Sequence, residues 1–342
     1  MTYIRMLFIS VLGCGAMVSG FAFHRHVAEL RAARLSQVAV PTPYFPPGSI
    51  WTQDISHAPL DPQSSTIISW LSEAGGWGMG RMQVDFGLRA LQAEANTPSV
   101  LIHNGPGLYT WDSDSVSAVP LPVGGGMEDQ SGYQCDLEKS DCHLIVADRS
   151  HGKLYEAFQA TLVNGALDAA FLAVWDLNRI YPPSGRGEGC TSADAAGFPI
   201  APLLFNADEL ASGSINHAIR FILPNPRIRA KVYVHPASHA GAPRGPDSAP
   251  PMGARFRLKA SYDVSQLKPA AQVVARAMQK YGMFLSDGGN IALTAQNDAD
   301  TNAKYADVDF GPRALRALKV TDFEIVDGGT PIQLTDDCRR NR

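Results

Sequence analysis

Beyond residue 100 the chain alternates between short apolar segments and turns rich in glycine and proline. Apolar segments rich in β-branched and aromatic residues are typical of strands. The clearest example is 143–160, HLIVADRSHGKLYEAFQA, whose two apolar runs flank Ser-His-Gly and predict a β-hairpin. Further strands are expected within 168–177, 217–223, 231–237 and 254–263.

Helical signals are fewer. The segment 64–76 predicts a first helix, with serines at its start and glycines at its end. One longer helix is expected near 269–281, because Pro269 stands at its first turn and a glycine follows its end. Many short strands with a few short helices favour a mainly β fold, like a β-sandwich or jelly roll.

Two capping patterns follow one another in the middle of the chain. Thr191 and Asp194 in GCTSADAAGFPI have the spacing of a capping box, and Asn206 and Glu209 repeat it before Gly213. We therefore expect a helix to begin at each. A helix start at Thr191 would make Asp194 part of the frame of a site, and its free amides would suit an anion.

The sequence VDFGLRALQA at 84–93 recurs almost unchanged as VDFGPRALRA at 308–317. A duplicated domain would also show similarity in the flanking residues, and these flanks differ. We interpret the pair as chance or as local convergence on a strand-turn-helix.

Composition narrows the class of protein. The 342 residues are 45% hydrophobic and only 18% charged, with 31 glycines and 24 prolines, which agrees with a turn-rich β protein. The formal net charge is −4, and the sequence has no block of lysine and arginine of the kind that tracks phosphates. Nucleic-acid binding is therefore not expected. The sequence also has no glycine-rich phosphate loop between a strand and a helix, so a nucleotide cofactor is not expected either.

The first residues predict export. One arginine precedes an apolar run from Met6 to Phe23, so 1–23 has the form of a signal peptide. The run is also long enough to span a bilayer, and no Ala-x-Ala cleavage site follows it, so membrane attachment through residues 6–23 is the alternative. Either way we expect a secreted or periplasmic protein.

The rest of the chain is expected to form one folded unit. A proline-rich spacer at 24–48 precedes a single β-rich domain at 49–330, and a polar tail follows at 331–342.

Export gives the cysteines a meaning, because disulfides persist in oxidising compartments. Cys135 and Cys142 enclose a short polar loop, and Cys190 with Cys338 would tie the tail to the domain. Four unpaired thiols are the alternative. We do not expect a metal site here, since no Cys-x-x-Cys spacing occurs.

Alternation along two strands places polar residues on one face of each. Lys231, Tyr233 and His235 share a face of the first strand, and Arg255, Arg257 and Lys259 share a face of the second. If these faces adjoin, they form a groove suited to a polysaccharide, especially an acidic one, because arginine pairs with carboxylates. A solvated outer face of an antiparallel sheet is the alternative interpretation.

Histidines and carboxylates supply the candidate chemistry. His235, Tyr233, Asp194 and His217 are candidate catalytic residues, and His239 joins the substrate-binding set. His217 lies among apolar positions, which is also typical of a buried structural histidine. Glycoside hydrolysis would need two carboxylates flanking one bond, and the sequence alone does not pair the candidates, which are Asp148, Glu156, Asp176, Asp194 and Asp287.

Several segments resemble a group of exported, largely uncharacterised bacterial proteins. The segments that carry the resemblance are SIWTQDIS (49–56), VDFG (84–87), LIVADR with LYE (144–156), GCTSADAAGFPI (189–200), INHAIRF (215–221), PPMGARFRLKASYD (250–263) and YGMFLSDGG (281–289). The resemblance implies one integrated domain over about 49–327 and brings no activity with it. Where that group has tryptophan before TSADAAG, this chain has Cys190, which suits a disulfide particular to its lineage.

Together these features favour an exported enzyme that degrades a polysaccharide, either a glycoside hydrolase or a polysaccharide lyase, without a cofactor. A lyase would use a histidine or tyrosine as base, and arginine or lysine to neutralise a uronate. A non-catalytic glycan-binding or structural protein of the cell envelope is the alternative.

Overall fold

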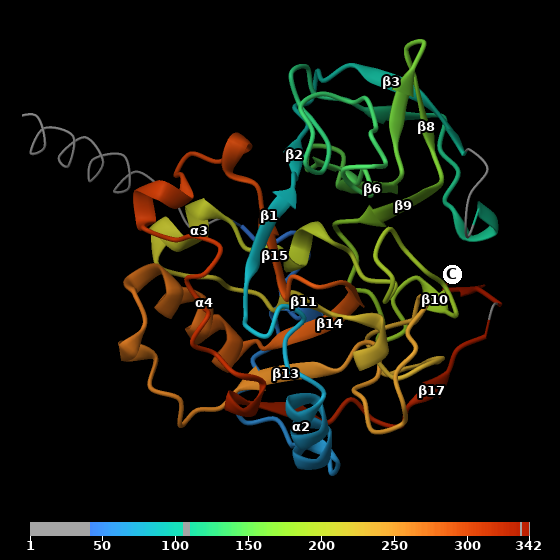
Figure 1. Cartoon of the computed structure of the whole chain (residues 1–342). Coiled ribbons are helices and arrows are strands. Elements are labelled where there is room, and N and C mark those ends of the chain that lie inside the picture. Colours follow the sequence, from blue (N-terminus) through green and yellow to red (C-terminus); the bar gives the residue numbers. More distant parts are fainter. Residues whose placement is uncertain (1–41, 105–109, 336, 342) are drawn as a thin grey trace, which may run out of the picture.

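The computed structural model describes residues 42–104, 110–335 and 337–341. Short strands make up most of its regular structure, which confirms the predicted mainly β fold with few helices. The chain forms a larger body and a smaller lobe, drawn at the top of Figure 1. Each part has its own cluster of buried apolar side chains.

A six-stranded mixed sheet forms the centre of the body, in the order β1-β15-β11-β14-β13-β16. The pairs β1/β15 and β11/β14 are parallel, whereas β13 is antiparallel to both of its neighbours. The strands are β1 (Val84–Leu88), β11 (Ile219–Leu223), β13 (Arg255–Leu258), β14 (Met283–Gly288), β15 (Leu293–Gln296) and β16 (Phe323–Val326).

Helices cover parts of this sheet. α4 (Pro269–Lys280) packs against β13 and buries Ala271, Val274 and Met278, which confirms the predicted longer helix. α2 (Ser64–Glu73) packs against β16 and confirms the predicted first helix. α3 (Ala207–Ser212) is a single short turn of helix. Single 3₁₀ turns occur at Ile50–Thr52, Thr110–Asp112, Ala201–Leu203, Asn225–Arg227, Val264–Gln266, Asp298–Asp300, Tyr305–Val308 and Val320–Asp322.

The lobe contains two four-stranded sheets, with orders β2-β5-β6-β9 and β4-β3-β8-β7. The hairpin predicted at 143–160 is confirmed as β5 and β6, which pair antiparallel. The strands are β2 (Leu91–Gln92), β3 (Ser99–Asn104), β4 (Ala118–Pro120), β5 (Leu144–Asp148), β6 (Lys153–Phe158), β7 (Thr161–Val163), β8 (Ala166–Ala169) and β9 (Phe171–Asp176).

The sheet that contains β5 joins the lobe to the body. Ile145 and Ala147 pack into the core of the body, whereas Leu144 and Val146 pack into the core of the lobe. Successive side chains of a strand point to opposite faces, so both faces of this sheet are covered. A strand covered on both faces needs a continuous apolar run, which explains the sequence LIVA.

The segments at both ends of the described chain pack onto the body. Phe45, at the end of the predicted spacer, is buried against Trp175. In the predicted tail, β17 (Ile332–Gln333) pairs with β12 (Val232–Tyr233), and β18 (Arg339–Arg340) pairs with β10 (Gly187–Glu188). The predicted export segment, 1–23, lies outside the described residues. Within the described ranges, no helix has the length and apolarity needed to cross a membrane.

Both predicted disulfides are present. Cys135 and Cys142 close a short loop of the lobe, and Cys190 joins Cys338 across 148 positions of sequence. Two disulfides of this kind indicate an oxidising environment outside the cytosol.

One of the two predicted helix starts is confirmed. Asn206 accepts a hydrogen bond from the amide of Glu209, the carboxylate of Glu209 accepts one from the amide of Asn206, and α3 ends at Gly213. The helix predicted at Thr191 does not form: 191–199 is a series of bends and turns. Asp194 is used differently, because Arg220 binds its carboxylate.

The two copies of the repeated sequence adopt different structures, so the predicted strand-turn-helix is wrong for both. The copy at 84–93 forms β1 and β2, whereas the copy at 308–317 forms turns. They lie side by side, since the amide of Val84 donates to the carbonyl of Pro312 and the rings of Phe86 and Phe310 are 6.3 Å apart.

Candidate active site

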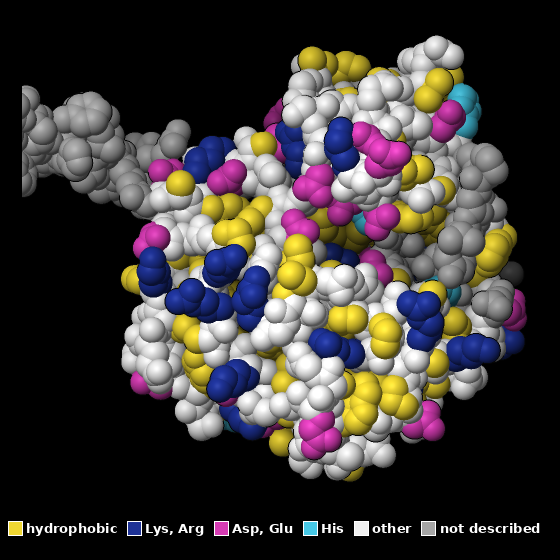
Figure 2. Space-filling view, in the orientation of Figure 1, with side chains coloured by type: hydrophobic (Ala, Val, Ile, Leu, Met, Phe, Trp, Pro, Cys, Tyr) yellow, Lys and Arg dark blue, Asp and Glu magenta, His cyan; other side chains and the backbone are white. Residues whose placement is uncertain are grey.

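A cleft of about 270 Å³ lies between the lobe and the body. Figure 2 shows acidic side chains gathered along this border, around a hollow with apolar walls. Four parts of the chain converge on it: the lobe, the loop that follows β10, the carboxyl ends of β11 and β14, and the loop at 239–242. Its lining includes Asp141, His143, Phe158, Phe171, Thr191, Ser192, Asp194, Asn225, His239 and Asp287.

Arg220 links the two carboxylates on the body side. Its Nη2 lies 2.6 Å from Oδ1 of Asp194 and 3.8 Å from Oδ2 of Asp287, while Nη1 donates to the hydroxyl of Thr294 at 2.6 Å. The side chain of Asp194 is fully buried, whereas that of Asp287 is 34% exposed. Asp287 is therefore the carboxylate of the pair that a ligand in the cleft can reach.

Burial changes the proton affinity of both carboxylates. It raises the pKa of Asp194 to about 7, against the opposing charge of Arg220, and the charge of Asp287 adds to the rise. Burial also raises the pKa of Asp287, with a further contribution from Asp141 of the lobe. A carboxyl group with a raised pKa is able to act as a general acid near neutral pH.

His143 joins the lobe to the loop that carries Asp194. Its Nδ1 lies 2.7 Å from the carboxylate of Glu128, and its Nε2 lies 3.0 Å from the carbonyl oxygen of Ala193. Both partners only accept hydrogen bonds, so both ring nitrogens must donate and the ring is an imidazolium. Burial alone would lower the pKa of His143, but Glu128 raises it to about 9.

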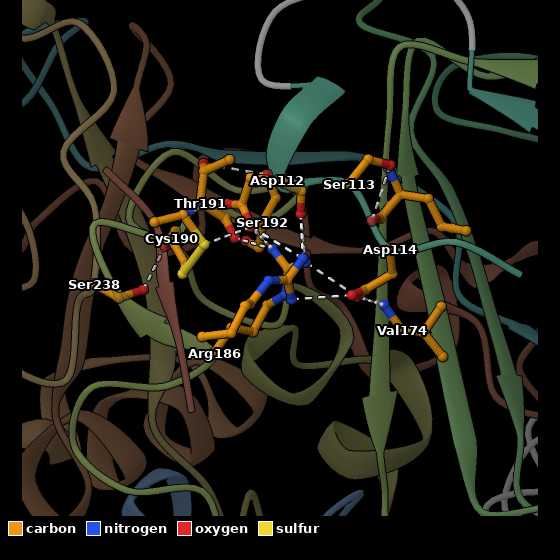
Figure 3. A network of polar contacts seen from close by, with 12 residues as sticks. Asp112, Ser113, Asp114, Val174, Arg186, Cys190, Thr191, Ser192 and Ser238 are labelled. Atoms are coloured by element: carbon orange, nitrogen blue, oxygen red, sulfur yellow. Dashed lines mark hydrogen bonds and ion pairs between the residues drawn. A yellow bond between two sulfur atoms is a disulfide. The ribbon is translucent and has the colours of Figure 1, made fainter. Parts of the chain in front are cut away.

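A buried arginine holds the start of the same loop (Figure 3). Arg186 contacts the carbonyl of Thr191 and pairs with Asp114 at 3.0 Å and with Asp112 at 3.6 Å. The second oxygen of Asp112 accepts the amide of Thr191 at 2.6 Å. Arg340 of the tail completes the network with ion pairs of 3.0 Å to both aspartates.

The disulfide lies against this network. Within the described ranges, the carboxylate of Asp112 and the sulfurs of Cys190 and Cys338 form the one group with ligand atoms close enough for a metal, within 4.8 Å of one another. Both sulfurs are used in the disulfide, and arginines occupy the carboxylate. The group therefore fits a structural clamp better than a metal centre.

Two of the predicted site residues, Asp194 and His239, reach the cleft. Nδ1 of His239 lies 3.0 Å from the amide nitrogen of Gly241 and 2.9 Å from the carbonyl oxygen of Ala195, so two loops hold the ring. Tyr233 and His235 lie elsewhere and share Glu188, at 2.6 Å from the hydroxyl and 2.7 Å from Nε2. Burial and Glu188 raise the pKa of Tyr233.

The two strands predicted to form a groove do not adjoin. β12 pairs with β17, whereas β13 pairs with β14 and β16. Lys231 is exposed, and its carbonyl oxygen accepts the amide of Leu334.

The arginines of β13 are buried rather than aligned along an open face. Arg255 donates to the carbonyls of Tyr281 and Gln53 and stacks on Phe284, and burial lowers its pKa to about 9. Arg257 pairs with Glu324 at 2.6 Å and also binds the carbonyls of Ile55 and Ala58. Lys259 donates to the carbonyl of Thr321 at 2.7 Å. These three side chains fasten segments of the body together.

His217 fits the structural interpretation. Its Nδ1 lies 2.7 Å from the carbonyl oxygen of Ala218, and its Nε2 lies 3.0 Å from the carboxylate of Glu209. It borders a second cavity of about 350 Å³ beside α3. Both nitrogens face acceptors, so His217 has no lone pair to serve as a base.

The remaining candidate carboxylates also have structural partners. Glu156 is fully buried and accepts the amides of residues 200 and 201 and the indole N–H of Trp175, and burial raises its pKa to about 7. Asp148 accepts the hydroxyl of Ser150 in the turn after β5. Asp176 pairs with Lys153 at 3.4 Å on the surface.

Sequence reasoning did not identify Asp141, His143 or Arg220. A signal was present for Arg220, because a lone arginine inside the apolar strand HAIRFIL requires a buried acidic partner. Asp141 and His143 are the neighbours of Cys142 in the sequence. The predicted disulfide at Cys142 therefore indicated that both residues lie in a fixed part of the chain. No feature of the sequence alone placed either of them opposite Asp287.

The fold and the cleft define a mainly β protein with a carboxylate-lined site between two parts of one chain. Comparisons of the chain with protein-family models, curated proteins and solved structures found no match.

Proposed function

We propose that the protein is an exported glycoside hydrolase that cleaves a polysaccharide in this cleft, with Asp287 and Asp141 as its two reacting carboxyl groups. The observation that carries the proposal is their placement. Both line one cleft, Asp287 from the body and Asp141 from the lobe, close enough for the charge of Asp141 to affect Asp287.

The environments of the two groups suit different roles. Asp287 is half-buried beside Arg220, has a raised pKa and is the proposed acid. Asp141 is solvent-exposed and is the proposed base. The acid donates its proton to the glycosidic oxygen, the bond to C1 breaks, and water supplies a hydroxyl to C1 and a proton to the second carboxylate.

Asp194 and Arg220 are positioning residues in this proposal. Arg220 contacts Asp194 and Asp287 with one nitrogen and fixes the carboxylate of Asp287 at the wall of the cleft. On the lobe side, Phe158 and the largely buried Phe171 contribute apolar lining to the cleft. Aromatic rings suit the apolar faces of sugar units.

The charges of the cleft favour hydrolysis over β-elimination. A lyase needs a cation to neutralise the carboxylate of a uronate, but the two cations here are already paired, His143 with Glu128 and Arg220 with Asp194. The cleft thus favours neutral sugar units. A glycan-binding protein without activity would use the same walls and is the second outcome that the experiment distinguishes.

The test is incubation of the full chain with a panel of neutral and acidic polysaccharides. Reducing ends and the ultraviolet absorbance of unsaturated uronates are followed together. We expect new reducing ends without that absorbance, and a loss of at least about a hundredfold in rate for Asp287→Asn and for Asp141→Asn. Asp168→Asn, an exposed change in the lobe, is the control and should leave the rate unchanged.

Three results would overturn the proposal. Absorbance of unsaturated uronates would indicate a lyase. Retention on a glycan without any product would indicate a binding protein. Full activity of Asp287→Asn would show that the reaction does not depend on this cleft.

A further inference from the structure

An open groove of about 830 Å³ lies on the body beside the first turn of α4. It shares no described lining residue with the cleft or with the cavity beside α3. Its charged lining consists of Lys268, Arg313, Arg316 and Asp309. Figure 2 shows lysine and arginine side chains gathered over this part of the body, in the region of α4. The protein carries a net charge of −4, so this concentration of positive charge is local.

The turns at 311–319 place the basic residues on one side. The amide of Ala314 donates to the carbonyl of Gly311, and that of Arg316 donates to the carbonyl of Arg313. Hydrogen bonds between residues three apart give about three residues per turn, so positions 313, 316 and 319 fall on the same side. Leu315 and Leu318 are fully buried on the other.

The repeated sequence provides an internal comparison. Arg89 of the first copy is neutralised by Asp300, with hydrogen bonds of 2.9 and 2.7 Å. The matching residue of the second copy is Arg313, and Arg316 replaces Gln92. Among the residues that the structure describes, no acceptor contacts the guanidinium of Arg313 or Arg316. Lys268 pairs with Asp309 on the surface at 2.8 Å.

The shape and composition of the groove favour a soluble polymer over a membrane surface. The large exposed hydrophobic side chains of the described residues, such as Trp111 and Ile180, lie outside the groove. Surfaces that insert into lipid combine basic residues with exposed aromatic or aliphatic ones. An open basic groove without them suits a chain of sugars that carry carboxylates, which arginine binds through paired hydrogen bonds.

We propose that this groove is a binding site for an anionic polysaccharide, held by Arg313 and Arg316, and that it is independent of the catalytic cleft. Binding there retains the protein on an acidic polymer while the cleft acts on another part of the same material. No bond is made or broken in the groove.

The test measures binding of polygalacturonate to the full chain by affinity electrophoresis, with dextran as the neutral comparison. Every protein in this assay carries Asp287→Asn, so that cleavage of the polysaccharide does not interfere with the measurement of binding. We expect Arg313→Glu/Arg316→Glu to weaken binding at least about tenfold, and binding of the parent to fall steeply between 50 and 200 mM salt, roughly as for other polyanions. Lys139→Glu, at a 68% exposed lysine of the lobe, makes the same charge change as Arg313→Glu alone and should alter binding less than about twofold.

The milder pair Arg313→Gln/Arg316→Gln guards against misfolding, and thermal melting checks both variants. Weakening by Lys139→Glu equal to that caused by Arg313→Glu alone would show that only net charge matters and would overturn the site. Binding to phosphatidylglycerol vesicles but not to polygalacturonate would overturn the polysaccharide as ligand. Failure of this test leaves the hydrolase proposal intact, because that proposal is tested by the formation of reducing ends and not by binding.

Discussion

Nε2 of His143 lies 3.0 Å from the carbonyl oxygen of Ala193, and this hydrogen bond joins the lobe to the loop that carries Asp194. The opposite nitrogen of the ring is held by Glu128. A charged histidine thus fixes the two walls of the cleft relative to one another. A neutral ring has only one N–H and could donate to only one of its two partners, so we expect this link between the walls to weaken as the pH rises through the pKa of His143.

Replacement of His143 by glutamine should destabilise the protein by about 3 kcal/mol at pH 7, since it leaves Glu128 buried without its cation. The pKa of His143 is about 9 in the folded chain, above the usual value of 6.5. Its contribution is therefore complete below about pH 6.5 and is lost as the pH rises through 9. Urea denaturation of parent and variant should show a difference at pH 7 that shrinks by about pH 10.

His151→Gln is the matched control, because His151 also pairs with an aspartate but its side chain is 65% exposed. We expect a cost below about 1 kcal/mol at either pH. A His143→Gln difference that is the same at pH 7 and pH 10 would contradict the charged state of the ring.

Local signals predicted the elements that depend on local interactions. The hairpin at 143–160, the helix after Lys268 and the cap at Asn206 rest on turn residues, Pro269 and a reciprocal hydrogen bond, and all three are present. The cap at Thr191 has the same spacing, yet its residues are used in contacts with distant segments, with Asp112 for Thr191 and Arg220 for Asp194.

The predicted groove fails for a related reason. Alternation shows which side chains share a face but not what covers that face. Residues 53–58 lie across the face of β13, and their carbonyl groups accept hydrogen bonds from Arg255 and Arg257. A pairing between positions about 200 residues apart leaves no periodic trace in the sequence.

The cleft itself combines segments that no local rule connects. Asp141, Asp194 and Asp287 come from the lobe, a loop and the end of β14, and Arg220 joins two of them. The sequence analysis had Asp194 and His239 among its site residues and Asp287 among its unpaired candidate carboxylates. Asp287 lines the cleft and also accepts the amide of Gly288 at 2.6 Å.

Gly197, in the loop that carries Asp194, is expected to tolerate replacement poorly. Its φ is +78°, and an added Cβ would lie 2.2 Å from Oγ of Ser238 and 2.7 Å from the carbonyl oxygen of Cys190. Gly213 has a φ of +79° with no atom within 4 Å of such a Cβ, so Gly213→Ala measures the backbone strain alone.

Gly213→Ala should cost about 1 kcal/mol, and Gly197→Ala about 3 kcal/mol, because the steric term adds to the strain. Urea denaturation gives both values, and turnover of the glycan substrate should fall for Gly197→Ala alone. Equal costs for the two variants would mean that Ser238 moves aside freely.

The two disulfides should differ in their contribution to stability. Cys190–Cys338 spans 148 positions and Cys135–Cys142 spans 7. Chain entropy alone assigns about 5 kcal/mol to the first and about 2 kcal/mol to the second. We therefore expect the double alanine variant of the first pair to unfold at a lower urea concentration than that of the second, with loss of the tail contacts of Arg340. A larger effect of the short loop would contradict this.

Asp194 should make stability decrease with pH across the acid range. Its folded pKa is about 7, above the ordinary value of 3.8, so the folded state holds a proton that the unfolded state has lost. Stability contributed by this proton is complete below about pH 4 and is lost as the pH rises through 7, by up to about 4 kcal/mol.

Asp194→Asn removes the titration, so its free energy of unfolding should fall less between pH 4 and pH 8 than that of the parent. Glu156 still titrates in both proteins, which leaves a residual slope in the variant. Urea denaturation at several pH values tests this, and parallel curves for the two proteins would show that Asp194 is ionised throughout and bound as a carboxylate to Arg220.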